Sequence, residues 1–126
     1  MDSPFGPVGT ARYLLLTSFK IDGSPVATPV WAALDNGKLY VSSLPDAGKV
    51  KRIRRNPEVT VQQCTIRGKA RGEIVRGTAV LLDEAATAKA RQLIRHRYGF
   101  QGWIATLSSR LRRGDNANIG IEISAS

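Results

Sequence analysis

The stretch Pro25–Ser43, PVATPVWAALDNGKLYVSS, decides the fold. Its two halves are rich in apolar and β-branched residues, which are typical of strands. Between them stands Asp35-Asn36-Gly37-Lys38, and an Asn-Gly pair between two apolar runs is a strong hairpin signal. The stretch therefore predicts two antiparallel strands, Pro25–Leu34 and Leu39–Ser43, joined by a tight turn.

The residues just before this hairpin extend it to a third strand. An apolar run leads from Ala11 to Phe19, and Ile21-Asp22-Gly23-Ser24 reads as a turn in which the Asp-Gly pair supplies positive φ. Pro29 lies inside the strand that follows. Because proline has no amide hydrogen to give to a ladder, we expect it at a sheet edge, at a bulge or facing a ligand.

The rest of the chain adds strands and helices to this meander. Residues 58–66, 69–82 and 118–124 read as strands, with Gly72 and Gly77 marking bends or bulges, and residues 47–55, 83–98 and 101–113 have helical periodicity. The sequence predicts a mostly β (α+β) fold, a six-stranded, partly open antiparallel barrel with two to three flanking helices. At 126 residues it is expected to be one domain over residues 1–126, with residues 1–10 as an N-terminal arm.

Charge gives the first indication of function. The chain has 19 Lys and Arg against 10 Asp and Glu, a net charge of +9, and 16 of the basic residues lie within residues 49–113. Such a field attracts anions: nucleic acid, an anionic membrane surface, or a phosphorylated or carboxylated small molecule. The single cysteine, Cys64, excludes an intrachain disulfide, and one cysteine without the apolar region of a signal peptide leads us to expect a cytoplasmic protein. No apolar run approaches the roughly 20 residues of a membrane span.

Side chains that could carry out catalysis on their own are scarce. His96 is the only histidine and fits a cation at a helix C-terminus, Cys64 fits a packed strand residue, and Asp83-Glu84 fits a helix N-terminus. No metal ligands stand at a useful spacing. If the protein is an enzyme, a cofactor therefore performs the chemistry, and the chain binds and orients it.

The best candidate binding segment is Gly48–Pro57, GKVKRIRRNP. It follows a strand that ends in Ser42-Ser43, and Lys49 falls in the first turn of the expected helix. Hydroxyl groups, a helix N-terminus and a lysine together make a phosphate site. The alternative is a solvated basic helix face. Five cations within seven residues repel one another, which favours a site that holds an anion.

Four segments together resemble a known family. They are Ala27–Trp31 (ATPVW), Leu39–Ser43 (LYVSS), Lys49–Val61 (KVKRIRRNPEVTV) and Arg76–Val80 (RGTAV). In this order they resemble the pyridoxamine-phosphate-oxidase-like split β-barrel superfamily, and more specifically its branch of deazaflavin (coenzyme F420)-dependent oxidoreductases. The resemblance spans roughly Ala11 to Ser124 and implies a homodimer with two cofactor sites at the subunit interface.

The resemblance also implies roles for particular residues. The cofactor ring would lie against the backbone of Pro29, Val30 and Trp31. Ser42 or Ser43, together with Lys49 and either Lys51 or Arg55, would hold the phosphate. Tyr98 and Trp103 would close a substrate pocket from the partner subunit, although both also fit as core anchors. The implied reaction is hydride transfer between F420 and a small unsaturated or quinone-like substrate.

Other functions stay open at this point. Relatives that use FMN resemble an arrangement with a basic residue on the second strand, and none occurs between Lys20 and Lys38, which favours F420 over FMN. An FMN or haem protein on the same barrel, a cofactor carrier without catalysis and a small basic nucleic-acid-binding barrel are the alternatives. Aromatic residues make up only 6% of the chain, which disfavours nucleic acid. The charge of Arg91–Arg97 and Arg110–Arg113 has no assigned role.

Overall fold

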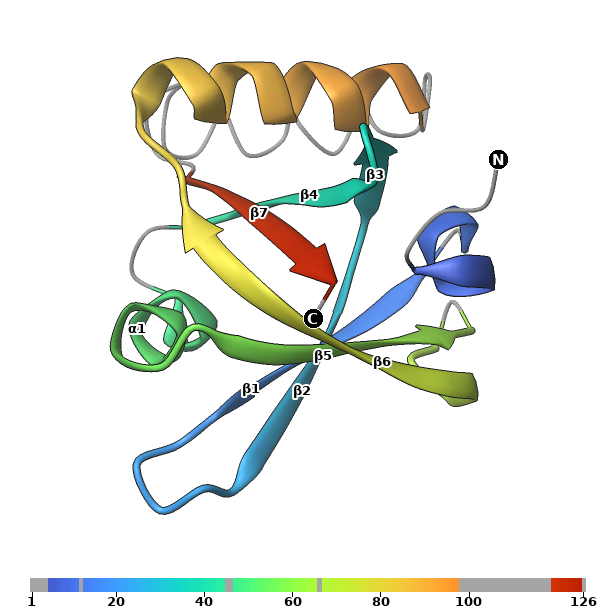
Figure 1. Ribbon diagram of the computed structural model, residues 1–126, viewed down its shortest axis with the longest axis vertical. Coiled ribbons are helices and arrows are strands. Elements are labelled where there is room, and N and C mark those ends of the chain that lie inside the picture. The colour runs from blue at the N-terminus through green and yellow to red at the C-terminus, as the bar shows by residue number, and fades with distance from the viewer. Residues whose placement is uncertain (1–4, 12, 45–46, 66, 98–118, 126) are drawn as a thin grey trace.

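The computed structural model describes residues 5–11, 13–44, 47–65, 67–97 and 119–125. The described residues form seven strands, and a helix lies between the last two (Figure 1). In chain order the elements are a 3-10 helix η1 (Gly6–Thr10), β1 (Leu14–Phe19), β2 (Pro25–Val30), β3 (Ala32–Asp35), β4 (Lys38–Ser43), α1 (Gly48–Arg55), β5 (Glu58–Cys64), β6 (Ala70–Leu81), a helix over residues 84–97, and β7 (Ile119–Ala125).

All seven strands form one antiparallel sheet in the order β2-β1-β5-β6-β7-β4-β3. The two edge strands, β2 and β3, are consecutive in the chain and only Trp31 separates them. The sheet is therefore curled into a half-barrel, since one continuous segment supplies both of its edges. This agrees with a mostly β split barrel.

The prediction of six strands was wrong by one. The expected strand Pro25–Leu34 is two strands, because its first part pairs with β1 and its second part pairs with β4. The chain changes its pairing partner at Trp31. Pro29 lies in an edge strand, opposite Leu15 of β1, which is one of the three positions expected for it.

One turn and one bulge lie where the sequence predicts them. Asn36 and Gly37 have φ of 51° and 76°, and Asp35 pairs with Lys38, so the predicted two-residue hairpin is confirmed. Gly72 has φ of 75°, and the register of β5 against β6 shifts next to it, so the predicted bulge is also confirmed.

The core lies on the concave side of the sheet. The strands contribute every second side chain, and α1 adds Val50 and Ile53. Residues 5–10 were expected within an N-terminal arm, yet Phe5 and Val8 are 1% and 2% exposed and belong to the same core. Burying a side chain of this size stabilises the fold by about 1.5–3 kcal/mol.

The helix over residues 84–97 covers the outer face of β3, β4 and β7 (Figure 1). Asp83 begins it as predicted, since its Oδ1 accepts a hydrogen bond of 2.8 Å from the amide of Ala86. Near the same end, the amide of Gly120 in β7 donates to the Thr87 hydroxyl at 2.8 Å. No helix among the described residues is both long and apolar enough to span a membrane.

Arg97 ties this helix to the edge of the sheet. Its guanidinium donates to the carbonyl oxygen of Ala32 in β3 and, at 2.8 Å, to that of Ala11. Part of the charge left unassigned in Arg91–Arg97 therefore has a structural role. Arg110–Arg113 and the expected helix over residues 101–113 lie outside the described residues.

Replacing Arg97 by alanine is expected to lower the free energy of unfolding by about 1.5–3 kcal/mol, because two carbonyl groups lose a charged donor. Urea denaturation of the variant measures this loss. His96→Ala is the matched control, since His96 is its exposed neighbour on the same helix. Equal stability of the two variants would contradict the structural role of Arg97.

Candidate functional site

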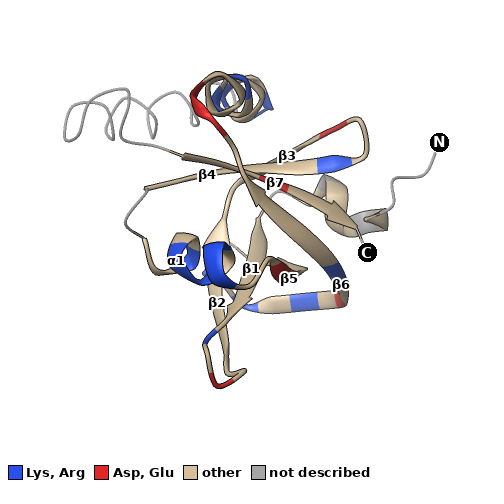
Figure 2. Cartoon of the chain, turned by 60° about the vertical axis from the view of Figure 1, so that its left-hand side comes forward, with Lys and Arg blue, Asp and Glu red and all other residues tan. Residues whose placement is uncertain are grey.

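Burial of the apolar side of α1 determines where its basic residues lie. Val50 and Ile53 stand three residues apart and are 0% and 2% exposed, so they fix one side of the helix against the core. The other positions of α1, apart from Gly48, hold basic residues, which are blue in Figure 2. They are Lys49, Lys51, Arg52, Arg54 and Arg55. No carboxylate of a described residue lies within 4 Å of any of them.

Helical geometry separates the two lysines. Each residue turns the helix by about 100°, so Lys49 and Lys51 lie about 160° apart around its axis. Lys49 is half-buried and Lys51 is exposed. The structure therefore does not bring these two predicted phosphate ligands together. The cation nearest to Lys49 around the helix is Arg52, which lies about 60° away.

Arg52 was not predicted as a site residue. Its Nε donates a hydrogen bond of 2.7 Å to the Oγ of Ser18, which is fully buried in β1. Its Nη1 lies over Gly48, only 2.8 Å from the position that a Cβ at Gly48 would take. Arg52 thus reaches back over the first turn of α1, as long side chains on a helix do.

The charge on Lys49 is opposed by its surroundings. Partial burial of the amine lowers the pKa of Lys49, and the neighbouring charge of Arg52 lowers this pKa further. Two cations thus stand side by side, one of them partly desolvated, at the end of α1 where the helix dipole is also positive. An anion bound between them would relieve all three effects.

Arg55 takes a different position. Its Nη2 donates a hydrogen bond of 3.3 Å to the carbonyl oxygen of Phe19 at the end of β1. The predicted phosphate ligand Arg55 is therefore joined to the β1–β2 end of the sheet, and no described contact links it to Lys49.

Ser42 and Ser43 point to opposite faces of β4, because successive side chains of a strand alternate. Ser43 is 7% exposed, shares the core face with Val41, and donates to the carbonyl oxygen of Leu44 at 3.3 Å. Ser42 shares the outer face with Tyr40. The Oγ of Ser42 is buried and has no hydrogen-bond partner among the described residues. Only one of the two serines can thus face a given ligand.

The three residues expected beside the cofactor ring differ in their exposure and in the residues they pack against. Pro29 is exposed, and its ring lies 3.2 Å from the place of a Cβ at Gly68. Val30 packs against the main core. Trp31 packs against Ala33 and Ile94, beneath the helix over residues 84–97. Tyr98 and Trp103 lie outside the described residues.

The comparisons with known proteins bear on this arrangement. A family model described as pyridoxamine 5'-phosphate oxidase matches residues 8–120. The chain belongs to this family. No curated protein sequence matches the chain closely enough to count as a relative.

Solved structures of similar fold carry different names. This family member is 21% identical to a conserved hypothetical protein from Mycobacterium tuberculosis, with a TM-score of 0.70 over 94% of this chain and 75% of that one. An F420 reductase is 18% identical, with a TM-score of 0.65 over 94% and 90%. The heme storage protein from Vibrio cholerae is 12% identical, with a TM-score of 0.68 over 94% and 84%. At these identities the likeness shows the fold.

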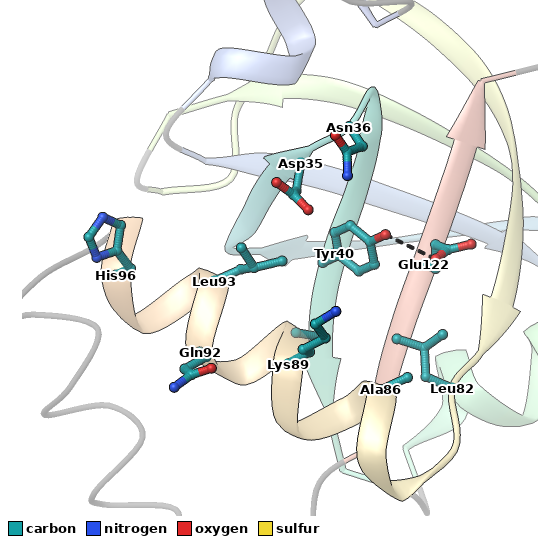
Figure 3. Close-up of a pocket in the computed structure, with 11 residues that line it drawn as sticks. Asp35, Asn36, Tyr40, Leu82, Ala86, Lys89, Gln92, Leu93, His96 and Glu122 are labelled. Carbon is teal, nitrogen blue, oxygen red and sulfur yellow. Dashed lines mark hydrogen bonds between the residues drawn. The ribbon is translucent and has the colours of Figure 1, made fainter.

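The pyridoxamine-phosphate-oxidase-like chain also has a cavity of about 610 Å³ that the sequence did not predict (Figure 3). It lies between the helix over residues 84–97 and the outer face of β3, β4 and β7. Tyr40 donates a hydrogen bond of 3.0 Å to Glu122. Burial raises the pKa of Tyr40, and this hydrogen bond raises it further. None of the predicted cofactor-site residues lines this cavity, although Ser42 lies on the same face of β4 as Tyr40 and Trp31 packs in one cluster with Leu93.

Cys64 is buried, and burial raises the pKa of its thiol, as expected for a packed strand residue. Among the residues that the structure describes, no three His, Cys, Asp or Glu side chains are grouped so as to hold a metal ion.

Proposed function

We propose that this chain binds coenzyme F420 and transfers a hydride between it and a small unsaturated or quinone-like substrate. Proteins of this family typically bind flavin-like cofactors. The observation that supports a phosphate-bearing cofactor is the half-buried Lys49 beside Arg52, with no described carboxylate nearby. When bound, the deazaflavin ring would supply the hydride chemistry, and the chain would supply binding, orientation and shielding from water.

The residues present fit the phosphate of such a cofactor. Lys49 has a positive charge without a described counter-charge, and the buried Oγ of Ser42 forms no hydrogen bond with any residue that the structure describes. We retain Lys49 as the principal phosphate ligand. Pro29–Trp31 remains the proposed place of the ring, because this segment is where the two edges of the sheet meet. Tyr98 and Trp103 remain proposed substrate-pocket residues.

F420 is preferred over FMN for two reasons. No basic residue occurs between Lys20 and Lys38 on the strand that, in the FMN-using relatives, is expected to help hold the phosphate. F420 also has a carboxylated tail, which suits a chain of net charge +9. The F420 reductase of the same fold is compatible with this choice. We place the protein, as a single split-barrel domain, in the cytoplasm, where its one thiol would stay reduced.

We further propose a homodimer with the cofactor sites at its interface. The register of the sheet places Pro29, Leu15, Gln62 and Ile74 in one row on the outer face of β2, β1, β5 and β6. Ile74 is 61% exposed there. A second copy of the chain would bury this row, in which Gln62 is the one polar residue, and would stand beside Pro29.

Replacing Ile74 by glutamate is expected to shift the protein from dimer to monomer, because a charge in an apolar interface must be desolvated. Sedimentation equilibrium measures the change. Ile21→Glu is the matched control, since Ile21 is 84% exposed in the β1–β2 turn. The proposed interface is wrong if both variants have the same mass as the unmodified protein.

A binding titration tests the proposed function. F420 and FMN are added separately to the purified protein at physiological salt, and cofactor fluorescence is followed. We expect saturable binding of F420, weaker binding of FMN, and F420-dependent turnover of a quinone. Saturable binding without turnover would make the protein a cofactor carrier. Binding of nucleic acid or haem, with no binding of either cofactor, would refute the proposal.

A further inference from the structure

We propose that Arg52 is a second phosphate-binding residue of α1 and that, with Lys49, it makes the site specific for ligands that carry a phosphate. This inference rests on the proposed function. It adds a residue that neither the sequence prediction nor the family resemblance assigned to the site.

The position of Arg52 on the helix is the first reason. It stands three residues after Lys49 and four after Gly48, and both spacings put side chains on neighbouring parts of a helix surface. The Nη1 of Arg52 lies over Gly48, so the guanidinium stands at the first turn of α1, beside Lys49. A Cβ at Gly48 would stand 2.8 Å from this nitrogen, so the guanidinium would have to shift to make room for it.

The anchoring of Arg52 is the second reason. Its Nε donates to the fully buried Oγ of Ser18, and no other hydrogen bond joins the side chain of Arg52 to the part of the chain that the structure describes. The Ser18 contact fixes the guanidinium plane and leaves both terminal nitrogens available. A guanidinium held in this way loses little conformational freedom on binding, and its two nitrogens match two oxygens of one phosphate.

The absence of a described counter-charge is the third reason. No carboxylate of a described residue lies within 4 Å of either Lys49 or Arg52. Two adjacent cations repel each other, and a phosphate between them would turn this repulsion into two attractive contacts. A neutral ligand end, such as a free ribityl hydroxyl, would leave both cations unbalanced. We therefore expect this pair to distinguish ligands by whether they carry a phosphate and not by the kind of ring.

The experiment compares Arg52→Gln with Arg54→Gln. Both variants lose one charge from α1, but Arg54 is exposed and lies about 160° from Arg52 around the helix axis, on another side of the helix. Each is titrated with F420, with FMN and with riboflavin, which lacks the phosphate of FMN. Thermal unfolding is also followed in inorganic phosphate and in chloride of equal ionic strength, a readout that needs no cofactor.

We expect Arg52→Gln to weaken F420 and FMN about 10- to 100-fold and to leave riboflavin within about two-fold. Arg54→Gln should leave all three within about two-fold. Inorganic phosphate should stabilise the unmodified protein and Arg54→Gln, but not Arg52→Gln. Ser18→Ala keeps the charge and frees the guanidinium, so it should weaken the phosphate-bearing ligands several-fold; it serves in place of Arg52→Gln if that variant does not fold.

The outcomes separate the two proposals. Equal effects of Arg52→Gln and Arg54→Gln, or an equal loss of FMN and riboflavin, would overturn the role of Arg52 while leaving F420 binding intact. Stabilisation by phosphate that depends on Arg52, in a protein that binds neither cofactor, would support Arg52 and refute the proposed function. No response of the unmodified protein to phosphate or to any phosphate-bearing ligand would overturn both.

Discussion

Replacing Lys49 by alanine is expected to weaken the binding of F420 by roughly 10- to 100-fold. The substitution removes one charge-assisted hydrogen bond to phosphate, and such a bond contributes about 1.5–3 kcal/mol. Because Lys49 is partly shielded from water, its charge is screened less than that of an exposed lysine. Fluorescence titration of the variant against the unmodified protein measures the loss.

Lys51→Ala is the control for this result. It removes the same charge from the same helix, but Lys51 is exposed and lies on the opposite flank of α1. Its effect should stay within about two-fold and should vanish at high salt. If the Lys51 and Lys49 variants lose affinity equally, general electrostatic attraction holds the cofactor and Lys49 is not a specific ligand.

In the ligand-free protein, the charge of Lys49 is expected to lower the stability of the fold. Since the fold lowers the pKa of Lys49 below 10.5, the unfolded chain binds this proton more tightly than the folded one. Lys49→Met, which keeps the aliphatic length, should therefore raise the melting temperature at neutral pH. The gain should shrink as pH rises from the lowered pKa through 10.5, where both states lose the proton. A lower melting temperature at neutral pH would contradict this account.

Replacing Ile53 by alanine is expected to lower the free energy of unfolding by about 2–5 kcal/mol. Ile53 is 2% exposed and joins α1 to the main core, so its loss leaves a cavity beneath the helix. The variant should also bind F420 less tightly, because α1 would position Lys49 less firmly. Urea denaturation gives the first quantity and titration gives the second.

Ile21→Ala is the matched control for Ile53. Ile21 is 84% exposed, so the same change of side chain should alter stability by less than about 0.5 kcal/mol. Equal losses in the two variants would mean that α1 is not held by its apolar side. A loss confined to Ile53→Ala shows that the core, not the charge, supports the candidate site.

Much of the fold is readable from local sequence. The Asn36-Gly37 pair, the three-residue spacing of Val50 and Ile53, and the cap at Asp83 each act through neighbouring residues, so each predicted its element correctly. The break at Trp31 is different, because it arises where one segment changes its pairing partner from β1 to β4. Such a change depends on strands distant in sequence and has no local signal.

The candidate site also has features that sequence spacing could have predicted and one that it could not. Strand alternation could have shown that Ser42 and Ser43 face apart, and helical spacing could have shown that Lys51 faces away from Lys49. The same spacing would have singled out Arg52. Its anchor at Ser18 could not have been predicted, because β1 and α1 are brought together only by the tertiary fold.

Amide chemical-shift mapping tests the central claim most directly. F420 is titrated into the ¹⁵N-labelled protein, and the two candidate regions are compared in one spectrum. The account predicts that the largest shifts fall on Gly48, Lys49 and Arg52, with smaller ones near Trp31. Shifts that instead cluster around Tyr40 and Glu122, in the cavity beneath the helix over residues 84–97, would place the cofactor elsewhere and contradict the assignment of α1.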